Sequence, residues 1–438
     1  MFASDTINTL KSEIVKFSQY ESLKNFYKSN PQYGILKDEC RRRERKLPFE
    51  HLFNFLLYPR VKSTDIELLE FSHLIEKDNV NKSDFSKRRR LIPAEYLKCL
   101  HKNMIKKLYS SQGFTKLHGH LLLAGDGTTY SLPNTREMKE VYLQGRKTGN
   151  GEQALARGIV LKDVLNDVIV ASNMESYGKD EIRLLQDEVN SLSQEVIKNN
   201  PIVLLDRKFC AYTMLVPLIE KGFGFVIRVK SGFNADVDEF ISSGENQKTI
   251  MLSPAATTVK KLRKLYGENV DCHFSLTLVR LSPNVVVMTS ITEPSLLNDM
   301  VDLYHFRWDA ESTIGFTKND LQIEIFSSSM ANSIRQDFYA RIIQYDLISL
   351  LSHQAAELRH GDSHRKINRN IALGIFKLEF DLFFNTDRHH FNRHLRKVLT
   401  EIARFTIENK PGRQNPRIFR KIKHSGKYIT LANYREAI

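Results

Sequence analysis

The stretch LLLAGDGTTY at residues 121–130 decides how this chain folds. Three leucines lead into an aspartate, Asp126, that has a glycine on each side. A short apolar run bounded by glycines is typical of a buried β-strand. A lone aspartate at the end of such a strand is usually a cap or turn residue, so the meaning of Asp126 depends on the rest of the sequence.

A hairpin and a helix are predicted next. The runs at residues 159–164 and 168–171 are rich in β-branched residues, and the turn Leu165-Asn166-Asp167 joins them. This pattern predicts a β-hairpin. Apolar residues from Ile182 to Val196 then recur at helical spacing, which predicts a helix after the hairpin.

A second aspartate closes the next strand. The run IVLLD at residues 202–206 is again apolar and β-branched and ends in Asp206. Three strands, a helix and a fourth strand are the opening order of the ribonuclease-H-like fold. The first and fourth strands of that fold are neighbours, so we expect Asp126 and Asp206 to lie side by side.

A third acid lies in YHFRWDAESTIGFTK, residues 304–318. Its polar residues Tyr304, Arg307, Glu311 and Lys318 are separated by three, four and seven positions, which on one helix places them on one face. A carboxylate can hold a divalent metal, and cations with a phenol can bind phosphate. With the two aspartates, this predicts an active site for a nucleic-acid backbone. Taken alone, the helix could also be a surface helix whose charges happen to align.

The combined pattern resembles a known family. The Y-x2-R-x3-E-x6-K spacing, with an Asp-Gly-Thr strand and a Leu-Asp-Arg strand upstream, resembles the DDE insertion-sequence transposases of the YREK group, the insertion-sequence-four family. The resemblance covers roughly residues 115–425, and the first hundred residues match only loosely. It implies catalytic, metal-binding roles for Asp126, Asp206 and Glu311, and DNA-holding roles for Tyr304, Arg307 and Lys318.

The three acids also indicate a cofactor and a mechanism. Carboxylates forced together repel unless a cation compensates, and ligands that are all oxygen favour Mg2+ or Mn2+. Two ions about 3.5–4 Å apart can serve an in-line displacement at phosphorus. We expect two ions, with Asp126 bridging both, Asp206 on one and Glu311 on the other. Water would free a 3′-OH at the transposon end, and that hydroxyl would attack the opposite strand or the target. The resemblance implies cut-and-paste chemistry with no covalent link to Tyr304.

Composition is consistent with a nucleic-acid partner. The chain has 438 residues, enough for two or three domains, and a formal net charge of +14 that suggests nucleic acid or an acidic membrane as partner. No apolar stretch approaches the ~20 residues that span a bilayer, and the start shows no secretory leader. Four widely separated cysteines predict neither a zinc site nor disulfides. We therefore expect a cytoplasmic protein associated with the bacterial nucleoid.

The expected fold class is α/β, a ribonuclease-H-like catalytic core interrupted by an all-β insertion, with an α-helical N-terminal domain. Strand-like runs at residues 223–230, 274–280 and 285–290 indicate the insertion, which the family resemblance also implies. The predicted divisions are a DNA-binding helical domain at residues 1–112, core at 113–214, insertion at 215–295, core at 296–400 and a basic tail at 401–438.

Further DNA contacts are predicted from basic clusters. Arg88 and Arg89 lie in an arginine-rich helix that is either part of a helix-turn-helix or a solvated basic helix packed on the catalytic domain. Residues 409–438, with Arg413 and Arg417, carry eight Lys or Arg against one Glu. We expect this tail to contact phosphates rather than remain solvated.

Two other residue types are ambiguous. Trp308, the only tryptophan, could stack on a splayed base, although a packed helix residue is the favoured interpretation. The histidines without cysteine neighbours are interpreted as packing or surface residues; they include His118, His120, His389, His390 and His394.

The expected partner is double-stranded DNA, as terminal inverted repeats and as target. Because both ends must be cut in concert, we expect a homodimer on DNA. Two alternatives remain open: a metal-dependent nuclease of the same fold that does not join strands, and an inactive or domesticated DNA-binding protein descended from a transposase.

Overall fold

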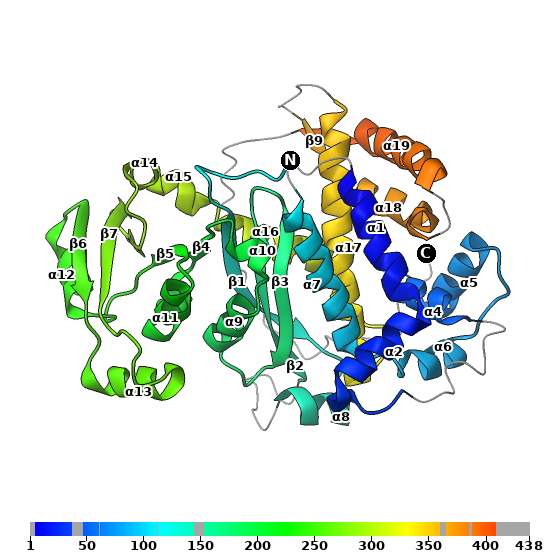
Figure 1. The fold of residues 1–438 in the computed structure, drawn as a ribbon, viewed down its shortest axis with the longest axis horizontal. Coiled ribbons are helices and arrows are strands. Elements are labelled where there is room, and N and C mark those ends of the chain that lie inside the picture. The colour runs from blue at the N-terminus through cyan, green and yellow to red at the C-terminus, as the bar shows by residue number, and fades with distance from the viewer. Residues whose placement is uncertain are drawn as a thin grey trace.

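A mixed β-sheet of eight strands forms the centre of the protein, in the order β3-β2-β1-β4-β5-β8-β7-β6 (Figure 1). The structure is a computed structural model that describes residues 5–36, 47–60, 62–111, 113–143, 153–359, 365–384 and 388–408. The sheet strands are β1 (Leu122–Ser131), β2 (Leu155–Asp163), β3 (Val168–Ser176), β4 (Ile202–Leu205), β5 (Gly224–Arg228), β6 (Gln247–Leu252), β7 (Phe274–Ser282) and β8 (Val285–Thr289).

The first four strands have the predicted arrangement. Strand β1 pairs antiparallel with β2, and β2 pairs antiparallel with β3. The helices α9 (Glu181–Asn190) and α10 (Gln194–Ile197) follow, and β4 then pairs parallel with β1 from Leu122 opposite Ile202 to Gly125 opposite Leu205. The predicted hairpin, helical region and neighbouring strands are therefore confirmed.

Strand β1 corrects one detail of the sequence interpretation. Strand β1 continues past Asp126 to Ser131, so Asp126 lies within the strand rather than at its end. The parallel pairing with β4, in contrast, ends at Gly125. The flanking glycines are needed for packing rather than for a turn. A Cβ on Gly125 would lie 2.7 Å from Cδ2 of Leu205, and a Cβ on Gly127 would lie 2.5 Å from Oε2 of Glu181.

The two faces of the sheet are covered by different helices. Leu122 and Ala124 pack in a cluster with Leu303 and Ala310, which belong to the segment just before and within the predicted acidic helix. Gly125 instead faces α9 on the other side. Since side chains alternate along a strand, Asp126 shares the face of Ala124. Asp126 therefore faces the helix that carries Glu311.

The predicted insertion is not all-β. Between β5 and β8 the chain also forms two helices, α12 (Ala235–Ser243) and α13 (Ala256–Tyr266). Strand β5, placed in the insertion by the sequence interpretation, pairs parallel with β4 and so belongs to the same sheet as β1. Strands β8, β7 and β6 then extend that sheet, so residues 215–295 form no separate β-domain.

The N-terminal region is helical, as expected, within the described part of residues 1–111. Its helices are α1 (Asp5–Ser18), α2 (Tyr20–Ser29), α4 (Phe49–Leu57), α5 (Thr64–Leu74), α6 (Lys82–Arg89) and α7 (Ala94–Ser110), with a 3-10 turn at Pro31–Tyr33. Helices α1, α4 and α7 pack against the long helix α17 (Ala331–Glu357), and both α17 and α7 also contact β3 of the sheet (Figure 1). Their apolar side chains join one continuous core with the sheet, so no break in packing marks residue 112.

The remaining elements complete the layers. They are α8 (Arg136–Met138), a π-helical turn at Lys139–Leu143, a 3-10 turn at Arg207–Phe209, α11 (Tyr212–Glu220), α14 (Pro294–Asn298), α15 (Met300–His305), α16 (Trp308–Asn319), β9 (Arg365–Ile367), α18 (Arg369–Leu378), a 3-10 turn at Phe380–Phe383, α19 (Arg388–Arg404) and β10 (Thr406–Glu408). Strands β9 and β10 form a separate antiparallel pair. In the described ranges, no helix combines the length and apolarity that a membrane span requires.

Candidate active site

Two of the predicted acids lie at matching positions of neighbouring strands. The parallel pairing of β1 with β4 ends at Gly125 opposite Leu205, and Asp126 and Asp206 are the next residues of the two strands. Adjacent strands are about 4.8 Å apart. The prediction that 80 residues of sequence separation bring these two acids together is confirmed by this register.

The segment that carries the third acid is not one continuous helix. Helix α15 ends at His305 and α16 begins at Trp308. Between them, the amide of Arg307 donates to the carbonyl of Tyr304 (3.1 Å), a three-residue turn tighter than an α-helical turn. Tyr304 therefore lies on α15, whereas Glu311 and Lys318 lie on α16, so the spacing spans two helices rather than one. Arg307 still contacts both the ring of Tyr304 and the carboxylate of Glu311.

The three acids lie close enough for the charges of two of them to change the pKa of the third. The pKa of Asp126 is raised to about 6, chiefly by burial, and the charges of Glu311 and Asp206 raise it further. The backbone amide of Gly127, which donates to Oδ1 of Asp126 (2.8 Å), and the cation of Arg307 act in the opposite direction. The three carboxylates are thus near enough to repel one another, as expected of a cation-binding site.

Arg307 is the cation within this acidic group. Its Nη2 lies 3.0 Å from Oε1 of Glu311, and its side chain is only 5% exposed. Asp206 also contributes to its raised pKa, although burial, the largest effect, acts to lower it. Its Nε and Nη1 are buried and have no acceptor among the described residues. Arg307 therefore holds Glu311 and retains hydrogen-bond donors that nothing described satisfies.

Tyr304 and Lys318 each form a hydrogen bond that joins their helix to a strand of the sheet. The buried Tyr304 donates its hydroxyl to the carbonyl of Leu205 (3.3 Å), the residue just before Asp206. Lys318 donates Nζ to the carbonyl of Thr129 on β1 (2.6 Å). Both contacts fasten α15 and α16 to the strands that carry the aspartates. The predicted role of these two side chains in holding DNA stays a prediction.

One cation at the site was missed by sequence reasoning. Strand β5 pairs with β4 up to Ile227 opposite Leu205, so Arg228 occupies the position beside Asp206. Its charge acts on the hydroxyl of Tyr304, whose pKa is raised to about 12, mainly by burial. The sequence signal existed, because GFVIR is another apolar run that ends in a charge. It was overlooked because β5 was assigned to a separate insertion.

The N-terminal arginines do not form the predicted DNA-reading surface. Arg89 is 1% exposed, and its Nη2 lies 2.8 Å from Oδ1 of Asp337 on α17. Arg88 donates to the carbonyl of Leu47. Arg89 is therefore a structural residue that packs α6 on α17 and is not available to read DNA, whereas Arg88 is half-buried.

The other predicted contacts have varied outcomes. Trp308 is 41% exposed and has the guanidinium of Arg307 4.5 Å from its ring, so the packed-residue interpretation is wrong. Arg413, Arg417 and the tail at 409–438 lie outside the described residues. Two of the histidines pair with acids: His120 lies 3.4 Å from Glu293 and His394 lies 2.5 Å from Glu379.

The donor chemistry of the three acids fits a hard divalent cation. All three candidate ligands are carboxylates. Burial and the charges of Glu311 and Asp206 disfavour the ionised form of Asp126, which a bound cation would favour. In the conformation described, no group of three His, Cys, Asp or Glu side chains in the described ranges is arranged to hold a metal ion. Glu311 is paired with Arg307 instead.

The comparison with protein families identifies one family. The transposase DDE domain family matches residues 118–347, more than half of the chain and the part that contains all three acids. A solved structure described as a cryo-EM structure of the piggyBac transposase synaptic complex with hairpin DNA is similar, with a TM-score of 0.41 and 13% identity over 93% of this chain and 84% of that chain. Comparison with curated proteins gives no match.

Proposed function

This chain belongs to the DDE transposase family, and we propose that it is an insertion-sequence transposase of the YREK group that cuts and joins DNA at the ends of its element. The observation that carries this proposal is the strand register, which aligns Asp126 with Asp206. Glu311 is brought to the same face of the sheet, within electrostatic reach of Asp126. We take these two aspartates and one glutamate to be the Asp-Asp-Glu group after which the DDE family is named.

Asp126, Asp206 and Glu311 would hold Mg2+ or Mn2+. When bound, two such ions would activate the attacking oxygen and stabilise the leaving one during displacement at phosphorus. The protein's own contribution is to hold the carboxylates. The Gly127 amide fixes Asp126, and Tyr304 fixes the end of β4 beside Asp206. The strands set the spacing of the two aspartates, and α16 sets the approach of Glu311.

Arg307 is proposed to change partners during this process. Its contact with Glu311 neutralises the acidic group while no metal is held. Metal binding would require Glu311 to turn from Arg307 toward the aspartates. The guanidinium, with Nε and Nη1 already lacking acceptors among the described residues, would then be available to a phosphate oxygen of the DNA. Arg228 would add a second positive charge at the same edge of the sheet.

The outer face of α19 is the proposed DNA-backbone surface among the described residues. Arg393, Arg396, Lys397 and Arg404 recur at helical spacing and are exposed, whereas the apolar face of the helix is buried. Arg404 is partly neutralised by Glu401 at 2.6 Å. The three remaining cations would release counterions on binding phosphates. The basic tail at 409–438 follows in sequence and would add to this charge.

The deciding experiment is cleavage of a labelled duplex that carries the element's own end, with Mg2+, by the wild type and by Glu311→Gln. We expect end cleavage by the wild type and a loss of roughly a thousandfold or more in the variant, because the isosteric amide cannot supply the negative charge that holds the metal. A homodimer assembled on two ends is expected to be the active species.

The products separate the alternative functions. Cleavage followed by joining to a target supports transposition, whereas cleavage without joining supports a nuclease of the same fold. Equal cleavage by wild type and variant contradicts the assignment of Glu311. Tight end binding with no cleavage by either protein supports the regulatory DNA-binding alternative.

A further inference from the structure

The helix that carries Glu311 is also held from its opposite side. Thr313 follows Glu311 by two residues, which is about 200° around a helix axis, and it is 2% exposed. Its Oγ1 lies 3.0 Å from the hydroxyl of Tyr345 on α17. Tyr345 donates its one hydrogen to Oδ1 of Asp167 (2.6 Å), so Thr313 must be the donor to Tyr345. A directed chain of hydrogen bonds thus runs from α16 through α17 to Asp167.

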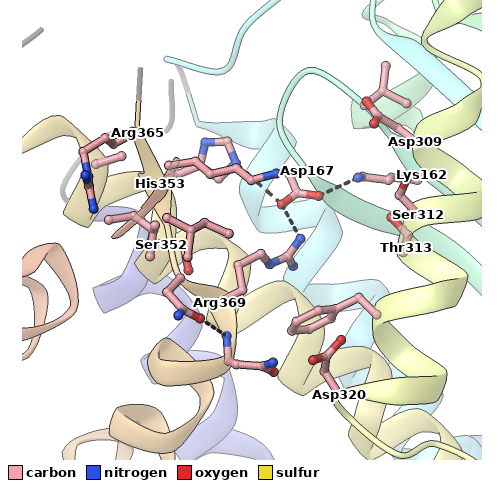
Figure 2. Close-up of a pocket in the computed structure, with 18 residues that line it drawn as sticks. Lys162, Asp167, Asp309, Ser312, Thr313, Asp320, Ser352, His353, Arg365 and Arg369 are labelled. Atoms are coloured by element: carbon pink, nitrogen blue, oxygen red, sulfur yellow. Dashed lines mark hydrogen bonds and ion pairs between the residues drawn. The ribbon is translucent and has the colours of Figure 1, made fainter. Parts of the chain in front are cut away.

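Asp167 is the centre of a charged cluster at the turn between β2 and β3 (Figure 2). Its carboxylate lies 2.5 Å from Nζ of Lys162 and 3.1 Å from Nη1 of Arg369, and it accepts a hydrogen bond from Ser349 (2.7 Å). Although burial alone would raise its pKa, Lys162 and Arg369 hold the pKa well below the ordinary value. Asp167 is therefore a permanently ionised acceptor.

A second link to α16 passes through Arg369. Its guanidinium lies 4.3 Å from the ring centre of Phe316, which is on α16, and 4.7 Å from the ring centre of Tyr345. Phe316 and Tyr345 also meet edge to face, with ring centres 5.9 Å apart. Since Arg369 is paired with Asp167, both contacts on this face of α16 depend on the same carboxylate.

Polar contacts add to the packing of α16 on this side. An open pocket of about 640 Å³ borders this face of α16, with Asp309, Thr313 and Phe316 among its lining residues (Figure 2). Beside this pocket, the hydrogen-bond chain and the stacked guanidinium supplement the apolar contacts of Phe316 in fixing where α16 lies.

We propose that Asp167 and Tyr345 are positioning residues for Glu311, acting through the back face of α16. The proposal rests on the proposed function of Glu311 as a metal-binding acid. When the link is intact, the part of α16 that carries Glu311 is held beside Asp126; when it is broken, α16 shifts and the carboxylate of Glu311 no longer starts from a position close to the aspartates. Residues that orient metal ligands from behind typically change metal affinity or activity about 10- to 100-fold when altered.

The test removes one hydroxyl from Tyr345. Tyr345→Phe keeps the ring beneath Arg369 but cuts the connection between Thr313 and Asp167. We expect end cleavage to fall about 10-fold or more and the Mg2+ concentration for half-maximal rate to rise by a similar factor, with DNA affinity unchanged. The fluorescence of Trp308, the only tryptophan and the first residue of α16, should also change in metal-free protein without DNA.

Tyr339→Phe is the matched control. Tyr339 is on the same helix, is equally buried at 1% exposure, and donates its hydroxyl to Oδ1 of Asn173 (3.2 Å) rather than to the Asp167 cluster. It should lose comparable stability but keep the cleavage rate, Mg2+ dependence and Trp308 signal. If Tyr345→Phe behaves in the same way as this control, Tyr345 is only a structural residue and the proposal is wrong.

A second pair of variants covers the case in which Tyr345→Phe does not fold. Thr313→Val removes the same link from the side of α16, and Thr313→Ser keeps a hydroxyl and should retain wild-type behaviour. Equal Trp308 signals and Mg2+ dependence for the two Thr313 variants would overturn the proposal. If the wild type cleaves no DNA, the proposed function fails, while the Trp308 comparison still shows whether this link sets the position of α16.

Discussion

At the level of single residues, the site is organised around unfavourable charge that a cation relieves. Asp126 is held among two other acids, and the guanidinium of Arg307 contacts Glu311 directly. Burial and the charges of these acids raise the pKa of Asp126, so the ionised form of Asp126 destabilises the metal-free protein. Function and stability therefore oppose each other at Asp126.

The raised pKa of Asp126 gives a prediction with a definite sign. A carboxyl whose pKa in the folded protein, about 6, exceeds its unfolded value near 4 weakens folding once it ionises. In metal-free protein, Asp126→Asn should therefore raise Tm relative to wild type above pH 6, by about 1–3 °C. The difference should shrink as the pH falls and vanish below about pH 4. Thermal unfolding in EDTA across this pH range measures it.

Metal addition provides the counterpart to that experiment. At pH 8, millimolar Mg2+ should raise the Tm of the wild type, since a ligand that binds only the folded state stabilises it, and should not raise the Tm of Asp126→Asn. If the variant is instead less stable than the wild type in EDTA at pH 8, the burial and repulsion of the ionised Asp126 carboxylate are not its main effect on folding.

At the level of elements, the glycines of β1 allow side chains from β4 and α9 to lie close to its backbone. Gly125→Ala should lower the free energy of unfolding by about 1–3 kcal/mol, because the new methyl group would meet Leu205 at 2.7 Å and push β4 away. Since β4 leads into Asp206, the cleavage rate should fall as well. Urea unfolding and the end-cleavage assay measure the two effects.

Gly315→Ala is the control for that substitution. Gly315 is on α16 with nothing within 4 Å of an added Cβ, and alanine favours a helix over glycine by up to about 1 kcal/mol. It should leave the protein as stable as wild type or slightly more so. Equal stability of the two alanine variants would mean that β4 yields to the methyl group without strain.

At the level of the whole molecule, we expect some positively charged surfaces to contribute more to DNA binding than others. Changing Arg393, Arg396 and Lys397 on α19 to glutamine should flatten the salt dependence of DNA binding by about two to three units of slope, because each phosphate that is no longer neutralised accounts for nearly one unit. The slope of log Kd against log salt concentration is the measurement.

Helix α13 offers a control of equal charge. Its exposed Lys260, Lys261 and Lys264 can be changed to glutamine with the same loss of three charges. This helix lies at the far end of the sheet from α19 (Figure 1). We expect the slope to stay near the wild-type value. If the α19 and α13 variants reduce the slope equally, DNA responds only to net charge, and α19 is not a specific surface.

The sequence by itself determined the local elements and the two aspartates. Apolar runs, β-branching and helical spacing are properties of neighbouring residues, and they predicted the hairpin, β4 and the pairing that aligns Asp126 with Asp206. The helix carrying Glu311 was also identified, although the break at Phe306 and Arg307 was not.

Only the tertiary structure decided what the charged side chains do. Arg89 looked like a DNA-binding residue in sequence, yet it is buried against Asp337, which is 248 positions away. Arg228 joined the site because β5 pairs with β4, and Asp167 became an ionised centre because Lys162 and Arg369 converge on it. A charge pattern along the chain is the same whether a residue faces solvent or a partner. Which of the two holds is set by long-range packing, because the partner is supplied by a distant segment.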